Sequence, residues 1–226
     1  MKAMILAAGR GERMRPLTDT LPKPLIEVRG KPLVEWHLER IAAAGIREVV
    51  INVSHLAERI MDALGDGRRW GLSIAWSRED PPLETAGGIA TARVLLGEAP
   101  FVLVNADVHC DHPLAALAGC DLGPRLGHIV LVPNPEFRPQ GDFSLNAGKV
   151  GNDDAPRYTY SGLAVLRPSI VDGVAPGSKA PLAPLLRKAA ADGRLGGEVH
   201  AGLWSDVGTP ERLAELNRAF TRTESP

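Results

Sequence analysis

Apolar runs and amphipathic stretches alternate along the first half of the chain. Apolar runs typical of buried strands occupy residues 3–8, 49–53, 72–76 and 101–104. The segments 32–45 and 54–65 between them repeat apolar residues at helical spacing and end at glycines. Strands that alternate with helices of this length favour right-handed crossovers and a parallel sheet. The pattern therefore predicts the α/β class, with a mainly parallel mixed sheet flanked by helices.

The pattern changes after residue 127. Strands are predicted at residues 129–132, 143–145, 149–150, 158–166 and 199–205, with an amphipathic helix at 182–191. A last helix after Pro210 has Leu213, Leu216 and Phe220 on one face. We expect a smaller, partly antiparallel part here. The chain is predicted to be one domain over residues 1–226, with halves at 1–127 and 128–226.

A basic, glycine-containing loop follows the first strand. Gly9-Arg10-Gly11 is succeeded by Arg13, Arg15 and Lys23. Glycine lets backbone N–H groups approach a phosphate, while guanidinium and ammonium groups give charge-assisted hydrogen bonds to its oxygens. The dinucleotide fingerprint would need glycine at position 14, where methionine stands, and the P-loop would need a Gly-Lys-Ser/Thr sequence, whereas prolines flank Lys23. The loop predicts a polyphosphate site of another kind.

Two aspartates stand where strands are expected to end. Asn105-Ala106-Asp107 follows the apolar run 101–104, and Asp206 precedes Thr209 and Pro210, which are suited to the N-cap and first turn of a helix. Asp107 alone would also suit a helix cap, and Asp206 alone would suit a loop. Ligands of such sheets bind outside the carboxyl ends of strands. Together the two carboxylates predict a cation site.

Two successive glycines have two explanations. Thr85 is a predicted N-cap before Ala86-Gly87-Gly88, and each glycine there costs about 1 kcal/mol of helix stability relative to alanine. Either a ligand approaches the backbone, or the helix packs tightly on the sheet. The sequence leaves both explanations open.

Composition and charge narrow the class of protein. The chain has 226 residues and a formal net charge of −1, so its basic residues form a local site rather than a nucleic-acid or membrane-binding surface. No leader-like h-region or membrane-spanning run is present in the sequence, and Cys110 and Cys120 are too few for a disulfide framework. We expect a cytoplasmic monomer or small homo-oligomer that acts on small molecules, without nucleic-acid or membrane partners.

A zinc site is a weaker alternative. His109-Cys110-Asp111-His112 contains possible ligands, but four consecutive residues do not match the usual spacing, and no second Cys/His pair follows at a usual distance. Zinc is therefore not expected here.

Several motifs together resemble those of the sugar-1-phosphate nucleotidyltransferases. They are L-A-A-G-x-G-x-R-M-x-P-L-T-x-x-x-P-K-P-L at the start, N-A-D at 105–107 and W-x-D-V-G-T-P at 204–210, in the family's order over nearly the whole chain. The resemblance implies a Rossmann-like nucleotidyltransferase fold with a small antiparallel sugar-binding part. It also implies an enzyme rather than a catalytically silent nucleotide-sugar sensor, because Arg13, Lys23, Asp107 and Asp206 are all present. No β-helix hexapeptide repeats are present, so no such C-terminal domain is expected.

The resemblance assigns roles to residues. It implies that Arg13, Lys23 and Asp107 are catalytic and that Asp107 and Asp206 bind Mg²⁺. Implied nucleotide contacts are Ala7, Ala8, Gly9, Gly11, Arg13, Lys23, Glu79, Leu83, Thr85, Gly87, Gly88 and Asn105. Implied sugar contacts are Asn146, Ser161 and Gly162. Many relatives carry an acidic residue and a lysine just before the strand at 158–166, whereas residues 151–156 here read G-N-D-D-A-P.

Further segments resemble short uridylyltransferases of peptidoglycan recycling. These segments are P-L-E-T-x-G-G-I, G-D-F and L-A-P-L-L-R. They imply UTP and N-acetylmuramic acid 1-phosphate as substrates. The alternatives are GTP with mannose 1-phosphate, and UTP or dTTP with glucose 1-phosphate.

Overall fold

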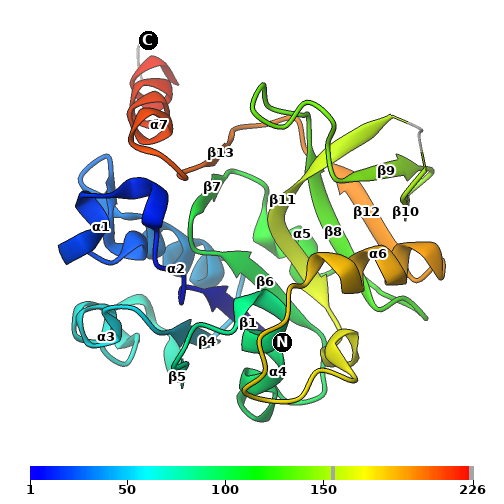
Figure 1. The fold of residues 1–226 in the computed structure, drawn as a ribbon, viewed down its shortest axis with the longest axis horizontal. Coiled ribbons are helices and arrows are strands. Elements are labelled where there is room, and N and C mark those ends of the chain that lie inside the picture. Colours follow the sequence, from blue (N-terminus) through cyan, green and yellow to red (C-terminus); the bar gives the residue numbers. More distant parts are fainter. Residues whose placement is uncertain (154–155, 224–226) are drawn as a thin grey trace.

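The computed structural model describes residues 1–153 and 156–223, and in the last helix it describes side chains as far as Ala219. Residues 154–155 of the G-N-D-D-A-P segment, and the side chain of Phe220, lie outside the described part. Figure 1 shows one sheet running through the molecule, with helices on either side of it. No helix of the described part is both long and apolar enough to cross a bilayer.

Nine described strands form this sheet, in the order β5-β4-β1-β6-β11-β8-β12-β10-β9. Their bounds are β1 Lys2–Leu6, β4 Glu48–Val53, β5 Ser73–Arg78, β6 Phe101–Asn105, β8 Gly127–Val132, β9 Phe143–Asn146, β10 Lys149–Gly151, β11 Arg157–Leu166 and β12 Leu195–Val199. Strands β5, β4, β1 and β6 are parallel, whereas β11 runs antiparallel to β6 and β8. Strand β12 is parallel to β8, and β9 and β10 form an antiparallel hairpin. The predicted mixed α/β sheet is confirmed.

Two small antiparallel sheets lie beside the main one. One pairs β2 (Glu27–Val28) with β3 (Lys31–Pro32), and the other pairs β7 (Val108–Cys110) with β13 (Trp204–Asp206). Asp206 lies opposite Val108 in the second pair, and Val207 N donates a hydrogen bond to Asp107 O at 2.8 Å. This pairing brings together two motifs that are about a hundred residues apart in the chain.

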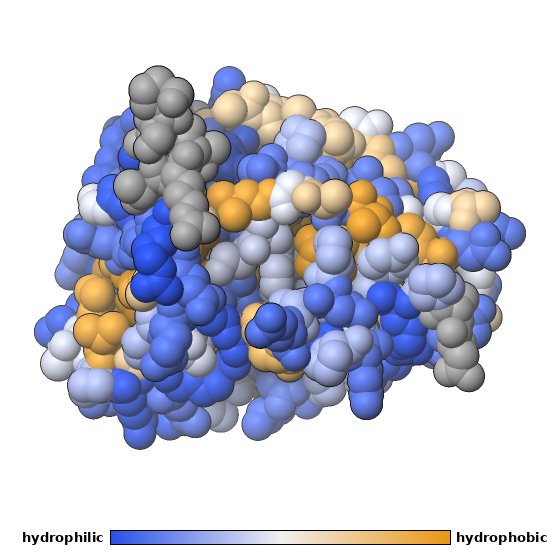
Figure 2. Space-filling view, turned by 90° about the horizontal axis from the view of Figure 1, so that it is seen from above, coloured by the Kyte–Doolittle hydropathy of each residue, from blue (hydrophilic) through white to orange (hydrophobic). Residues whose placement is uncertain are grey.

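Helices cover both faces of the sheet. Their bounds are α1 Leu17–Thr20, α2 Leu33–Ala43, α3 Ala57–Leu64, α4 Glu84–Leu96, α5 Leu114–Ala118, α6 Ala183–Ala191 and α7 Pro210–Thr223, with 3₁₀ turns at Glu12–Met14, Lys23–Leu25, Arg68–Trp70 and Pro168–Val171. Helix α7 stands at one end of the molecule, beyond β13 (Figure 1). On the face seen in Figure 2, polar side chains cover most of the surface and enclose smaller apolar patches.

Strand periodicity divides the core on the main sheet into two clusters, and a third, smaller cluster packs Met14 with Val207 and Leu216. Ile5 and Val104 pack with α2, α3 and α5 on one face, while Met4 and Leu103 pack with α4 and α6 on the other. Side chains alternate because successive residues of a strand point to opposite faces. Each cluster contains residues from before and after residue 128, so the two predicted halves share one core.

The structure corrects two local predictions. No single strand runs from residue 199 to 205, because β12 ends at Val199 and β13 starts at Trp204. Strand β12 was missed since it contains Gly196 and Gly197, which have low strand propensity. A Cβ at Gly197 would lie 2.6 Å from Val150 Cγ2, so close packing against β10 requires glycine there.

The two predicted helix caps have different outcomes. Thr85 is not an N-cap, because α4 begins one residue earlier, at Glu84. The cap at Thr209 is confirmed, since its Oγ1 accepts a hydrogen bond from Arg212 N at 3.4 Å.

A buried histidine should make the fold acid-sensitive. Burial, and then the positive charge of Arg40, lower the pKa of His37 from 6.5 to about 3. Neutral His37 therefore favours folding above pH 6.5, and this contribution is lost as the pH falls from there toward 3. At about pH 4.5 the loss should reach roughly 2 to 3 kcal/mol.

Between about pH 7.5 and 4.5, we predict that the free energy of unfolding falls by roughly 2 to 3 kcal/mol more in the wild type than in His37→Leu. Urea unfolding at both pH values measures this difference. Val94→Leu, at a position 86% exposed, is the control and should lose as much as the wild type. Equal losses in His37→Leu and the wild type would contradict the prediction.

Candidate active site

A cavity of about 730 Å³ opens at the carboxyl ends of β1 and β6. Its lining residues are Leu6, Ala7, Ala8, Gly9, Arg10, Gly11, Glu12, Arg13, Lys23, Pro24, Asn52, Glu79, Pro81, Pro82, Glu84, Thr85, Asn105, Ala106, Asp107, Lys179 and Gly208. Ten of the predicted site residues are among them: Ala7, Ala8, Gly9, Gly11, Arg13, Lys23, Glu79, Thr85, Asn105 and Asp107. The basic loop and the Asn-Ala-Asp motif therefore border one cavity.

The basic loop is folded tightly rather than extended. Gly11 has φ +65°, and a Cβ there would lie 2.9 Å from Thr18 Cγ2 and 3.1 Å from Lys23 Cβ. Thr18 Oγ1 donates a hydrogen bond to Gly11 O at 2.8 Å, while Met14 is fully buried and anchors the loop. A Cβ at Gly9 would meet no atom within 4 Å. Gly11 thus shapes the loop, and Gly9 leaves space at the cavity.

Lys23 and Asp107 form an ion pair at the cavity wall. Lys23 Nζ lies 2.7 Å from Asp107 Oδ2, and the two side chains are 9% and 37% exposed. Asp107 is the second residue after the end of β6, and it is not the cap of α5, which begins at Leu114. The pair places one positive and one negative group beside the cavity.

Asp206 has one paired and one unpaired carboxylate oxygen. Its Oδ2 accepts a hydrogen bond from Arg212 Nη1 at 2.9 Å, whereas its buried Oδ1 has no hydrogen-bond partner among the described residues. A buried unpaired carboxylate oxygen is costly, and oxygen ligands of this kind suit Mg²⁺. Because β13 lies beside β7, this residue is held next to the backbone of Asp107. The donor set fits a divalent cation.

Gly208 connects this carboxylate with the basic loop. A Cβ at Gly208 would lie 2.6 Å from Asp206 Oδ1, 3.0 Å from Arg212 Nη1 and 3.1 Å from Arg13 Nη2. Asp206 is not itself a lining residue of the cavity, but Gly208 and Arg13 both are. Asp206 and the predicted triphosphate-binding residue Arg13 therefore approach each other at one end of the cavity.

A buried hydrogen-bond network forms the opposite wall. Asn52 Oδ1 accepts from Ala7 N at 2.8 Å, and Asn52 Nδ2 donates to Glu79 Oε1 at 2.7 Å. Glu79 Oε2 accepts from Leu83 N at 2.9 Å. The network ties the loop after β5 to the end of β1. Sequence reasoning missed Asn52, although an amide within the apolar strand V-V-I-N-V was a signal.

Gly87 and Gly88 contact the protein rather than the cavity. A Cβ at Gly87 would lie 2.2 Å from Ser178 O, and one at Gly88 would lie 2.6 Å from Glu79 Oε1. Neither glycine nor Leu83 is among the lining residues, and Gly87 N already donates to Ala180 O at 3.1 Å. Tight packing, one of the two explanations left open by the sequence, accounts for both glycines. Direct nucleotide contacts by these three residues stay a prediction.

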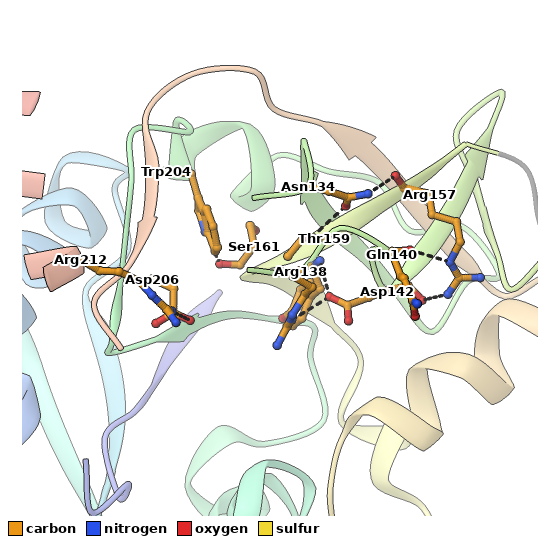
Figure 3. Close-up of polar contacts among 11 residues, drawn as sticks. Asn134, Arg138, Gln140, Asp142, Arg157, Thr159, Ser161, Trp204, Asp206 and Arg212 are labelled. Carbon is orange, nitrogen blue, oxygen red and sulfur yellow. Dashed lines mark hydrogen bonds and ion pairs between the residues drawn. The ribbon is translucent and has the colours of Figure 1, made fainter. Parts of the chain in front are cut away.

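The predicted sugar contacts lie at two places. Gly162 sits in a bulge of β11 with φ +87°, and a Cβ there would lie 2.9 Å from Asn105 Nδ2, next to the cavity. Buried Ser161 accepts a hydrogen bond from Trp204 Nε1 through its backbone oxygen at 2.9 Å (Figure 3). Asn146 instead lies exposed at the end of β9, and it is not a lining residue. Gly162 thus lies next to the lining residue Asn105 and Ser161 next to Trp204, but none of the three predicted sugar contacts is itself a lining residue.

A loop between β8 and β9 faces Asp206 and Arg212 in Figure 3. Asn134 Nδ2 donates to Arg157 O at 3.0 Å, and Arg138 Nη1 contacts Asp142 Oδ2 at 3.0 Å. The loop also carries Phe137, whose ring centre lies 3.7 Å from the guanidinium carbon of Arg212. Sequence reasoning missed Phe137 and Arg212, because nothing local in the sequence indicates that they meet.

The possible zinc ligands make an ion pair. The structure brings His200 to Cys110 and Asp111, with one ligand atom of each within 4.8 Å of the others. His200 Nε2 and Asp111 Oδ1 are 2.5 Å apart, which is a hydrogen-bond distance, and burial raises the pKa of the Cys110 thiol to about 11. The hydrogen bond between His200 and Asp111 and the burial of Cys110 describe how these three groups are held.

Comparison with known proteins agrees with this geometry. The nucleotidyl transferase family matches residues 2–119, which include the basic loop and Asp107. An N-acetylmuramate alpha-1-phosphate uridylyltransferase of Neisseria meningitidis is 50% identical over 95% of this chain and 96% of its own length. The chain belongs to the nucleotidyl transferase family. It is an enzyme of this family, and the expected family membership is confirmed.

Other relatives of this nucleotidyl transferase extend the comparison. A Caulobacter vibrioides protein of the same name is 37% identical over 94% of this chain and 97% of its own length. A Schizosaccharomyces pombe mannose-1-phosphate guanyltransferase is 32% identical over 93% of this chain, but over only 62% of its own length. A solved Bacillus anthracis structure, assigned as a glucose-1-phosphate thymidylyltransferase, superposes with a TM-score of 0.87 at 18% identity, covering 100% of this chain and 97% of that one. The last comparison confirms the fold.

Gly87→Ala and Gly9→Ala should separate packing from ligand binding. The first should lower the free energy of unfolding by about 1 to 3 kcal/mol, because its Cβ would overlap Ser178 O. The second should change stability by less than about 0.5 kcal/mol and weaken nucleoside triphosphate binding by about tenfold. Urea unfolding and calorimetric titration measure the two effects. A stable Gly87→Ala protein with weakened nucleotide binding would reverse this interpretation.

Proposed function

We propose that this nucleotidyl transferase transfers a uridylyl group from UTP to N-acetylmuramic acid α-1-phosphate. The products are the UDP-sugar and pyrophosphate. The observation that carries the proposal is the 50% identity, over nearly the full length of both chains, to the uridylyltransferase of Neisseria meningitidis. We place the reaction in cell-wall recycling in the cytoplasm, which agrees with substrates that are small and highly charged.

The chemistry requires positioning and charge neutralisation more than proton transfer. A phosphate monoester has a second pKa of about 6, so the acceptor is largely dianionic at neutral pH and needs no general base. One of its oxygens attacks the α-phosphorus of UTP in line, and the bond to the β-phosphate breaks as pyrophosphate leaves. The main obstacle is repulsion between the two anions.

Two cationic side chains lower this repulsion. Arg13 lines the cavity and is assigned to the β- and γ-phosphates, where it stabilises the departing charge. Lys23, largely buried beside Asp107, is assigned to the α-phosphate and the attacking phosphate. Backbone groups around Gly9 and Gly11 hold the triphosphate.

Asp107 and Asp206 are assigned to Mg²⁺. The unpaired buried oxygen of Asp206 and the partly exposed carboxylate of Asp107 support this choice. When bound, the ion neutralises phosphate charge and fixes the α-phosphate. In the absence of the ion, Lys23 keeps Asp107 in place.

The base is assigned to the wall made by Glu79 and the loop that follows it. Uracil presents one N3–H donor between two carbonyl groups, and Glu79, a lining residue of the cavity, carries two carboxylate oxygens. Each oxygen already accepts one hydrogen bond, from Asn52 or from Leu83, but a carboxylate oxygen has room for a second. Guanine would also need a partner for its amino group.

GTP with mannose 1-phosphate is the second candidate. The similarity to the Schizosaccharomyces pombe guanyltransferase supports this candidate, but the chain covers only 62% of that protein's length. Glucose 1-phosphate with UTP or dTTP is a further alternative.

Substrate choice is tested by pyrophosphate release. We expect kcat/KM for UTP with N-acetylmuramic acid 1-phosphate to exceed that for N-acetylglucosamine, glucose or mannose 1-phosphate, with either UTP or GTP, by at least about tenfold. A preference for an acceptor without the lactyl group would overturn the acceptor assignment. A preference for GTP would overturn the base assignment.

The cation site predicts metal dependence. Asp107→Ala and Asp206→Ala should each lower kcat/KM by about 10²-fold or more in the presence of Mg²⁺, with unchanged folding. EDTA should abolish activity of the wild type, and added Mg²⁺ should restore it. Asp62→Ala, an exposed carboxylate on α3, is the control and should retain activity. Normal turnover in EDTA would refute the cation site.

A further inference from the structure

Two arginines lie close to the same carboxylate. Arg212 Nη1 donates to Asp206 Oδ2 at 2.9 Å, and the two side chains are only 17% and 20% exposed. Arg13 Nη2 lies 3.1 Å from the position of a Gly208 Cβ, and Asp206 Oδ1 lies 2.6 Å from the same position. This nitrogen and Oδ1 are therefore within about 6 Å of each other, a range in which opposite charges attract strongly. Arg212 is thus the partner of Asp206 in the structure, and Arg13 lies near enough to be an alternative partner.

A contact between Arg13 and Asp206 would affect binding of both the predicted cation and the predicted triphosphate. If Arg13 turned toward Asp206, its guanidinium would occupy the oxygen that is unpaired in this structure. The same movement would take Arg13 away from the triphosphate. One rearranged side chain would then weaken the cation site and the nucleotide site together.

Arg212 is fixed in a way that favours the observed arrangement. Its first-turn position in α7 holds its backbone N–H against Thr209 Oγ1 at 3.4 Å, and its guanidinium carbon lies 3.7 Å from the ring centre of Phe137. A planar guanidinium can stack on a ring and donate to a carboxylate at once. The loop that carries Phe137 is itself tied to β11 by Asn134 (Figure 3). The helix and the loop therefore set the direction of the Arg212 side chain.

We propose that Arg212 is a positioning residue that holds Asp206 in its cation-binding orientation and prevents Asp206 from pairing with Arg13. The proposal rests on the cation and triphosphate sites of the proposed function. Arg212 acts through Asp206 and is not assigned a contact with either substrate.

The test measures Mn²⁺ binding to nucleotide-free protein by electron paramagnetic resonance, so that turnover is not the readout. Arg212→Gln should weaken Mn²⁺ binding by about tenfold, the usual effect of removing a partner of a metal ligand. Arg13→Gln alone should leave it unchanged or slightly tighter. The double variant should bind Mn²⁺ within about threefold of Arg13→Gln, because the competing guanidinium is gone. A merely structural role of Arg212 would not be rescued by a change at Arg13.

Controls separate the possible failures. Arg218→Gln removes the same charge from an exposed position of the same helix and should bind Mn²⁺ like the wild type. Unchanged binding in Arg212→Gln, or a defect that Arg13→Gln does not rescue, would overturn the proposal. Wild-type Mn²⁺ affinity in Asp206→Ala would overturn the cation site itself, and the proposal with it. Thermal unfolding of each variant checks that it is folded.

Discussion

The pairing of β7 with β13 is the interaction on which the candidate site depends. Three residues of each strand meet in an antiparallel register, and Val207 N closes the pair on Asp107 O. Without this contact, Asp107 would stand at the end of the main sheet with Lys23 alone, and the C-terminal motif would have no fixed place. Backbone hydrogen bonds, rather than the charges themselves, bring the segment of Asp206 beside that of Asp107. This order matters because two like charges repel each other and need a framework that is stable in the absence of a cation.

The charges at the site are arranged as competing pairs. Lys23 pairs with Asp107, and Arg212 pairs with Asp206, so each carboxylate is partly neutralised within the protein. In the proposed function, Oδ1 of Asp206 and the exposed part of Asp107 bind the cation, and Arg13 binds the anionic substrate. Such pairing keeps the carboxylates in place. Because Arg13 and Arg212 both lie near Gly208, however, either arginine could pair with Asp206, and the choice would affect cation binding.

The sequence predicted the sheet class and ten of the lining residues, because strand ends and a long motif determine them locally. Prediction from the sequence failed for features that depend on tertiary contacts. Strand β12 was hidden by Gly196 and Gly197, whose role is visible only when their neighbours are known. Gly87 and Gly88, for which the sequence left ligand approach and tight packing both open, lie against Ser178 and Glu79. His200 reaches Asp111 from 89 residues away, a distance at which no spacing rule applies.

The family match covers only part of the proposed cation site. Residues 2–119 carry the match and include Lys23 and Asp107, but Asp206 and Arg212 lie outside it. The N-terminal segment alone would therefore lack one carboxylate of the proposed cation site. It would also lack part of its core, since both apolar clusters on the main sheet draw on β8 and β11. Completion of the proposed site consequently requires the C-terminal half, and a cation held by both aspartates would stabilise the contact between the two halves by its binding energy.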